Sequence, residues 1–175
     1  MLSHQINKYI KDSLINGKLC RWDKSIVNVF VTPLLASERK EFWHSKVEQA
    51  ILSWNSVLRM NGINIQFMLV SVPQSADIVV HWVKVGRVYE GMCKYVSVVN
   101  GIFRKISIEI GMPNVYSGKD TTDLSIYCAI MHEFGHALGL GHGVDVDDIM
   151  FVPHQKNISI PSDNDIYVLK QIYSL

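Results

Sequence analysis

Residues 132–142 read HEFGHALGLGH, and the fold must be arranged around this stretch. On a helix, residues four apart lie on one face about one turn from each other, so His132 and His136 can reach the same metal ion. This spacing is the H-E-x-x-H zinc-binding pattern. Glu133 stands beside the first histidine, where its carboxylate can lie next to the metal without binding it.

Gly139 indicates how a third ligand reaches the same ion. A histidine further along a straight helix would point away, but glycine accepts positive φ, which ends the helix and turns His142 back. Three protein ligands leave one position for water, as in catalytic zinc sites. We therefore predict one catalytic Zn²⁺ held by His132, His136 and His142. Glu133 would take a proton from a zinc-bound water, whose pKa falls to about 7.

The alternative is a chance pattern on a buried helix, but five fixed residue types at these offsets seldom coincide. The stretch resembles the zinc motif of the metzincin endopeptidases, and the matrixins in particular. Met150, within Asp148–Phe151, resembles the methionine turn of that clan and would form a hydrophobic floor beneath the histidines. Asp145 matches the aspartate of matrixins at that offset, and residues 162–173 resemble their last helix.

The resemblance spans residues 21–175 and implies an α+β, metzincin-type domain. Its twisted mixed sheet should have about five strands, with a long helix and the active-site helix packed on it and a final helix in a small C-terminal part. Hydrophobic periodicity and turn signals place the elements. We expect a strand at 26–31, a helix from Ser37 to Gly62, strands at 63–70 and 77–85, a hairpin at 94–110 turning at Asn100-Gly101, an active-site helix from Thr121 or Thr122 to Leu138, and a last helix opened by a capping box of Ser162 and Asp165.

Residues 1–20 precede the part that resembles matrixins. Apolar residues at helical spacing within 4–16 predict a short amphipathic helix. It could pack against the body of the protein, or it could be a short pro-segment that covers the site, with Cys20 or Asp12 blocking the zinc. The expected organisation is therefore an N-terminal helix or pro-segment at 1–20 and a single zinc protease catalytic domain at 21–175.

The same resemblance assigns the strand and the pocket that would bind the substrate. The first hairpin strand, about Met92–Val99, should form the sheet edge along the cleft, where a peptide or protein substrate could bind as an extended strand. The alternative is an edge that is merely solvated. The resemblance assigns the side-chain pocket to Cys128, Phe151, Val152 and Pro153.

Many matrixins carry a structural zinc and calcium ions in a long loop in the region that corresponds to residues 86–110 here. Here that region contains no histidine, and its only acids are Glu90 and Glu109. We therefore predict neither a structural zinc nor a calcium site, which favours a minimal, prokaryote-type matrixin.

Composition excludes several classes of protein. The chain has 175 residues, enough for one domain, and a net charge of +1 that does not favour nucleic acid as a partner. No apolar run approaches the length of a membrane span. The N-terminus has no apolar region typical of a signal peptide, so we expect a cytoplasmic protein unless a leader precedes this sequence. The three cysteines do not suggest a disulfide framework.

These observations predict a zinc metalloendopeptidase in which Glu133 is the general base. Two alternatives use the same metal site: a catalytically silent zinc-containing peptide-binding module, and a zinc hydrolase of a non-peptide amide. Silent relatives usually lack the glutamate or a histidine, and all four residues are present here. The tyrosine that some metzincins carry two residues after the methionine is replaced by Val152, which disfavours astacin-like chemistry.

Overall fold

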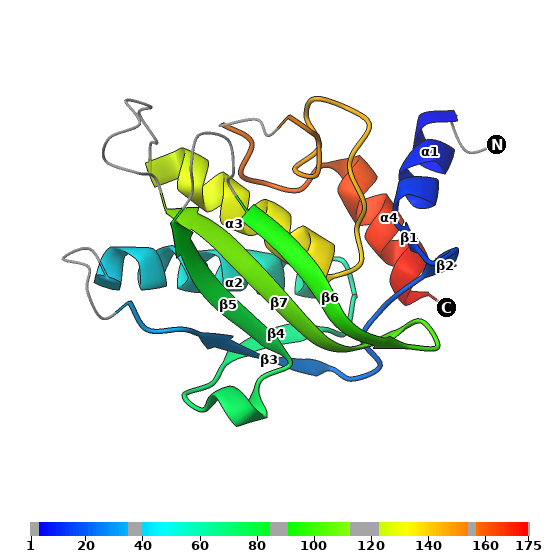
Figure 1. Ribbon diagram of the computed structural model, residues 1–175. Coiled ribbons are helices and arrows are strands. Elements are labelled where there is room, and N and C mark those ends of the chain that lie inside the picture. Colours follow the sequence, from blue (N-terminus) through cyan, green and yellow to red (C-terminus); the bar gives the residue numbers. More distant parts are fainter. Residues whose placement is uncertain (1–3, 35–39, 85–90, 113–122, 154–156, 175) are drawn as a thin grey trace.

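The structure, a computed structural model, describes residues 4–34, 40–84, 91–112, 123–153 and 157–174. Its centre is a five-stranded sheet in the order β4-β3-β5-β7-β6, with α2 and α3 packed on one face (Figure 1). The principal elements are β3 Ile26–Val31, α2 Lys40–Met60, β4 Gln66–Leu69, β5 Ile78–Lys84, β6 Gly91–Val99, β7 Ile102–Met112, α3 Asp123–Ala137 and α4 Asp163–Tyr173, with a 3₁₀ turn η1 at Pro73–Ser75. The predicted α+β fold with a mixed sheet is confirmed.

Strand β3 shows why the sheet needs helices on one side. Its residues alternate between exposed and buried, and Val27, Val29 and Val31 point into the core. Because β3 pairs in parallel with both β4 and β5, the chain must cross over between them, and α2 makes the first crossover. Trp54 of α2 is fully buried, and its Nε1 donates to the Met131 carbonyl oxygen at 3.0 Å, which joins α2 to α3.

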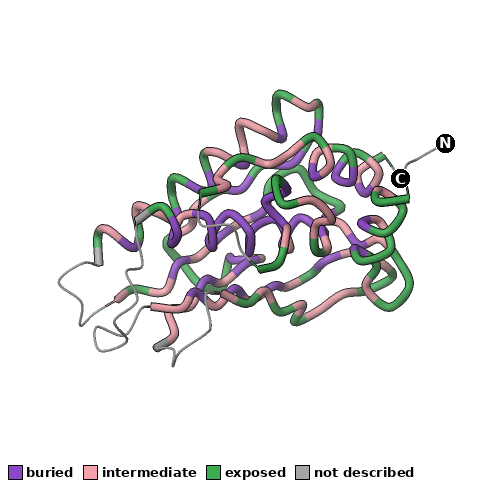
Figure 2. Tube along the Cα trace, turned by 90° about the horizontal axis from the view of Figure 1, so that it is seen from above, coloured by how far each residue is buried: buried purple, intermediate pink, exposed green. Residues whose placement is uncertain are grey.

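The hydrophobic core lies between the sheet and the two long helices, where buried residues concentrate along the middle of the molecule (Figure 2). Helix α2 contributes the apolar stripe that the sequence predicts, and these residues are all buried: Val47, Ala50, Ile51, Trp54 and Leu58. None of the helices in the described ranges combines the length and the apolar character that a bilayer crossing requires.

Strand β6 lies at the edge of the sheet and pairs antiparallel with β7, as predicted from the Asn100–Gly101 turn. Strand β4 is shorter than the predicted 63–70, because Ile63 and Ile65 enter the core from an irregular turn before the strand. The predicted helix caps at Ser37, Thr121 and Thr122 lie outside the described residues.

The N-terminal segment, residues 4–20, forms α1 His4–Asp12 and a small hairpin of β1 Leu14–Ile15 and β2 Lys18–Leu19. The helix ends earlier than the predicted residue 16, since the chain turns at Asn16–Gly17 to pair the two short strands. Helix α1 lies beside α4 (Figure 1).

Candidate metal centre

Three histidines from α3 and the loop after it converge on one point. Nitrogen atoms of His132, His136 and His142 all lie within 4.8 Å of one another, so they could hold a metal ion. The ring centroids are 4.7 Å apart for His132 and His136, 5.0 Å for His136 and His142, and 5.8 Å for His132 and His142. His132 is buried and the other two are less enclosed, which leaves the cluster accessible from one side.

The bend at Gly139 brings the third histidine into the cluster. Gly139 has φ +101°, and its N–H donates to the His136 carbonyl at 2.9 Å. The Leu140 N–H donates back to the Gly135 carbonyl at 3.1 Å. These two bonds are a Schellman motif, which ends a helix on a glycine in the left-handed region. The predicted turn is therefore present, and it carries His142 back over α3.

Backbone carbonyls orient two of the imidazoles. Nδ1 of His132 lies 2.9 Å from the Ile149 carbonyl oxygen, and Nδ1 of His136 lies 2.8 Å from the Leu140 carbonyl oxygen. Because a carbonyl can only accept, each Nδ1 must carry the proton, and Nε2 is then the basic nitrogen. This is the tautomer in which imidazole binds zinc, so the donor set fits that metal.

Glu133 is buried beside the edge strand β6. The backbone N–H of Cys93 donates to its carboxylate. Burial raises the pKa of this carboxyl to about 8, and the hydrogen bond from Cys93 opposes the rise. Its Oε2 has no hydrogen-bond partner within the described ranges. A water on a metal held by the histidines would supply such a donor, so Glu133 also fits a zinc site.

Gly91 makes room for this carboxylate. A Cβ at Gly91 would lie 2.6 Å from Cγ of Glu133 and 2.7 Å from its Oε1, closer than real Cβ contacts allow. The sequence motifs did not identify Gly91 or Cys93 as neighbours of Glu133. Gly91 is the first residue of β6 and lies just outside the predicted strand at 92–99, so no sequence pattern pointed to this contact.

Met150 is fully buried and lies against α3. A Cβ at Gly135 would be 2.3 Å from the Met150 sulfur, so a glycine is needed for this approach. The turn that carries Met150 is held by Asp148, whose Oδ2 accepts the N–H groups of Val144 and Asp145, both at 2.8 Å. The Asp148 carboxylate therefore helps to hold this turn in shape.

The four predicted pocket residues are not alike in their surroundings. Cys128 is buried on α3 and Phe151 is half-buried, whereas Val152 and Pro153 are exposed. Part of the segment expected to wall the pocket, residues 154–156, lies outside the described residues. The assignment of these four residues to a substrate pocket stays a prediction.

The two residues considered as zinc blockers do not belong to the histidine cluster, which contains neither Cys20 nor Asp12. Cys20 is buried, and its thiol donates to the Lys18 carbonyl at 3.6 Å and the Ile15 carbonyl at 3.9 Å.

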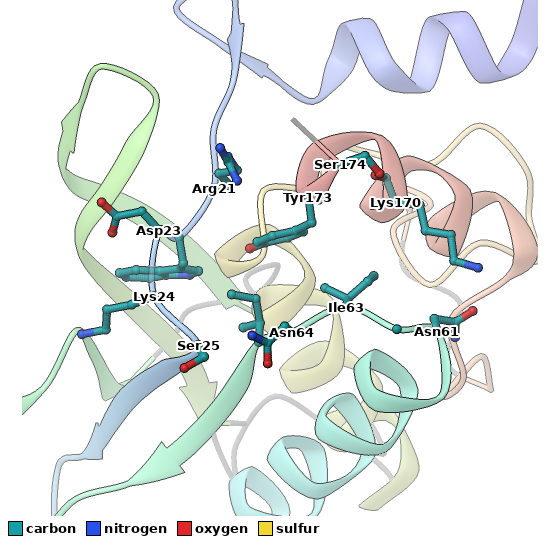
Figure 3. Close-up of a pocket in the computed structure, with 13 residues that line it drawn as sticks. Arg21, Asp23, Lys24, Ser25, Asn61, Ile63, Asn64, Lys170, Tyr173 and Ser174 are labelled. Atoms are coloured by element: carbon teal, nitrogen blue, oxygen red, sulfur yellow. The ribbon is translucent and has the colours of Figure 1, made fainter.

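A separate cavity of about 670 Å³ lies between the segment before β3, the turn after α2 and the end of α4 (Figure 3). Arg21, Lys24, Asn64, Lys170 and Tyr173 are among its lining residues. None of the three histidines lines it, so this cavity is not the metal centre.

Comparison with known proteins agrees with this geometry. The sequence profile of the Matrixin family matches residues 21–174, which include the three histidines, Glu133 and Met150. No match is found among proteins of curated function. Because the matched span covers most of the chain, the protein belongs to the matrixin family.

Proposed function

We propose that this protein is a zinc-dependent endopeptidase. The observation that carries the proposal is the convergence of three imidazoles within 4.8 Å, with the buried carboxylate of Glu133 contributed by α3, the helix that carries His132 and His136. Membership of the matrixin family supports the zinc metalloendopeptidase class. We assign His132, His136 and His142 as ligands of one catalytic zinc, and we expect neither a structural zinc nor a calcium ion.

The bound metal supplies two things: it lowers the pKa of a coordinated water to about 7, and it polarises the carbonyl of the peptide bond. The protein supplies the proton transfers. Glu133 accepts a proton from the attacking water as that water adds to the carbonyl carbon. It then delivers the proton to the leaving amine nitrogen as the C–N bond breaks.

The environment of Glu133 suits this role. Burial raises the pKa of the carboxyl, so the carboxylate is a stronger proton acceptor than an exposed glutamate would be. The Cys93 N–H and the space at Gly91 hold the carboxylate next to β6. Met150 would support the histidines from below.

Strand β6 is the proposed substrate-binding edge. Its outer side pairs with no other strand in the described part of the chain, so its backbone can add an extended peptide. Residues Gly91, Cys93 and Tyr95 are half-buried and Met92, Lys94 and Val96 are exposed, as expected for a strand with one covered face. A peptide added here would lie alongside Glu133, since β6 already contacts that side chain.

Digestion of a proteome-derived peptide library, with zinc analysis of the same sample, tests the proposal. We expect internal cleavages that disappear when a chelator removes the metal and return when zinc is restored. Bound zinc without cleavage of any peptide would contradict an endopeptidase and favour a binding module. Chelator-sensitive products from non-peptide amides alone would point instead to a different zinc hydrolase.

A further inference from the structure

The N-terminal segment, residues 4–20, precedes the span that matches the matrixin family, yet it lies against the loop that carries the third histidine. It contacts the loop that runs from the end of α3 to the methionine, residues 139–150, which we call the zinc-ligand loop. One chain of hydrogen bonds through Asp165 of α4 and two direct contacts connect the segment with this loop.

The first connection is indirect. A chain of hydrogen bonds runs from α1 through Asp165 of α4 to a histidine. The Tyr9 hydroxyl is buried and donates to Oδ1 of Asp165 at 2.5 Å. The other oxygen of Asp165 accepts the N–H of Ile149 at 2.9 Å. The Ile149 carbonyl in turn accepts the Nδ1 proton of His132 at 2.9 Å. Tyr9 therefore supports, through Asp165, the residue that orients the first ligand.

Asp165 depends on its donors because it is completely buried. Burial raises its pKa, and hydrogen bonds from Tyr9, Ser162 and Ile149 oppose the rise. Burial also raises the pKa of Tyr9, so the phenol remains protonated and keeps donating. Loss of one donor leaves a buried carboxylate with fewer hydrogen bonds, which loosens the groups it holds.

The second contact fixes the backbone before the third histidine. Ser13 Oγ accepts the N–H of Gly141 at 2.8 Å and donates to the Tyr9 carbonyl at 2.9 Å. Gly141 stands between His142 and Leu140, whose carbonyl orients His136. Ser13 therefore fixes the backbone between the Leu140 carbonyl, which orients His136, and the ligand His142.

The third contact is steric. A Cβ at Gly141 would lie 2.2 Å from the Asp12 carbonyl oxygen, and a Cβ at Gly139 would lie 2.4 Å from the Cys20 carbonyl oxygen. Both neighbours are backbone atoms, which cannot move aside as a flexible side chain can. The N-terminal segment thus lies directly against the zinc-ligand loop at two glycines.

We propose that the N-terminal segment is an intramolecular clamp on the zinc-ligand loop, in which Tyr9 and Ser13 are positioning residues that slow the release of zinc. The inference rests on the proposed function, because it takes the three histidines to be zinc ligands. A clamp differs from a pro-segment in its consequence. Loss of a pro-segment raises activity, whereas loss of the clamp weakens the hold on the metal.

The test measures zinc release from the full-length zinc protein into an excess of chromogenic chelator. Tyr9→Phe and Ser13→Ala are each expected to release zinc roughly 3- to 10-fold faster, since groups that orient metal ligands typically change metal affinity by 10- to 100-fold and these two act further out, Ser13 by one step and Tyr9 by two. The visible spectrum of the cobalt-substituted protein should shift in both variants.

Tyr127→Phe is the matched control. It removes a hydroxyl that is hydrogen-bonded at 2.7 Å to Ser53 of α2, a partner with no bond to the zinc-ligand loop. We expect its zinc release and cobalt spectrum to equal those of the wild type. Thermal midpoints of all variants show whether faster release follows the contact or a general loss of stability.

Several results would overturn the clamp. One is release from both Tyr9→Phe and Ser13→Ala at the wild-type rate, and another is equal acceleration by Tyr127→Phe. A third is higher peptidase activity with unchanged release, which would identify a pro-segment. If Tyr9→Phe does not fold, Ser13→Ala decides alone.

A wild-type protein that binds no zinc would refute the metal centre itself, whereas normal zinc binding with unchanged release in the variants refutes only the clamp.

Discussion

Glu133→Ala is expected to keep its zinc and to lose at least about three orders of magnitude in kcat/KM, because it removes the proposed general base and leaves the ligands in place. Glu133 follows His132 on α3, but its carboxylate is not part of the histidine cluster. Zinc content by metal analysis and cleavage of a peptide found in the library digestion provide the two measurements.

Glu48→Ala is the control for this substitution. Glu48 is exposed on α2, so its removal should leave both zinc content and turnover unchanged. Near-normal cleavage by Glu133→Ala with zinc bound would contradict the assigned role of the glutamate. Loss of zinc together with activity would mean that Glu133 contributes to metal binding.

Gly139→Ala is expected to weaken zinc binding by about tenfold or more, because groups that place metal ligands change affinity on this scale. An alanine at φ +101° is strained, and its Cβ would also lie 2.4 Å from the Cys20 carbonyl oxygen. Relief of that clash requires the chain to move between α3 and His142. Competition with a chelator of known affinity measures the effect.

Gly62→Ala separates the effect of backbone strain from the effect of the clash with the Cys20 carbonyl oxygen. Gly62 has φ +71°, and a Cβ at this position would have no atom within 4 Å, so the substitution tests the cost of backbone strain alone. That cost is about 1–2 kcal/mol in the free energy of unfolding. Zinc affinity should be normal in Gly62→Ala and reduced in Gly139→Ala. Equal zinc affinity in both variants would show that the bend at Gly139 does not position His142.

The features that could be predicted from the sequence are local ones. The four-residue spacing of His132 and His136 defines a helix face, and a glycine after the helix defines the bend. The same holds for the capping box at α4, where the Ser162 side chain accepts the Asp165 N–H, and for the hairpin between β6 and β7. In each case the signal and the structure lie within a few residues of each other.

The features that could not be predicted are contacts between distant parts of the chain. Tyr9 and Asp165 are 156 residues apart, and nothing near either residue indicates the other. Gly91 and Glu133 come together only when β6 is laid along α3. The early end of α1 has a similar origin, since Ser13, the residue after the helix, accepts the N–H of Gly141 in the zinc-ligand loop.

The proposed clamp includes two of these distant contacts, Tyr9 with Asp165 and Ser13 with Gly141. A short loop such as residues 139–150 must hold one ligand, His142, and the backbone carbonyls that orient the other two. The loop forms neither helix nor strand, so its rigidity depends on its own turn hydrogen bonds and on the elements packed against it. Helix α4 provides one support through Asp165, and the N-terminal segment provides the other through Tyr9 and Ser13.

Zinc X-ray absorption on the purified wild-type protein tests the convergence of the three histidines most directly. We expect one zinc per chain with three imidazole nitrogens and one oxygen, at about 2.0–2.2 Å. Loss of one imidazole should follow His142→Ala. Two imidazoles in the wild type, or a sulfur ligand at about 2.3 Å, would contradict a site built by the bend at Gly139.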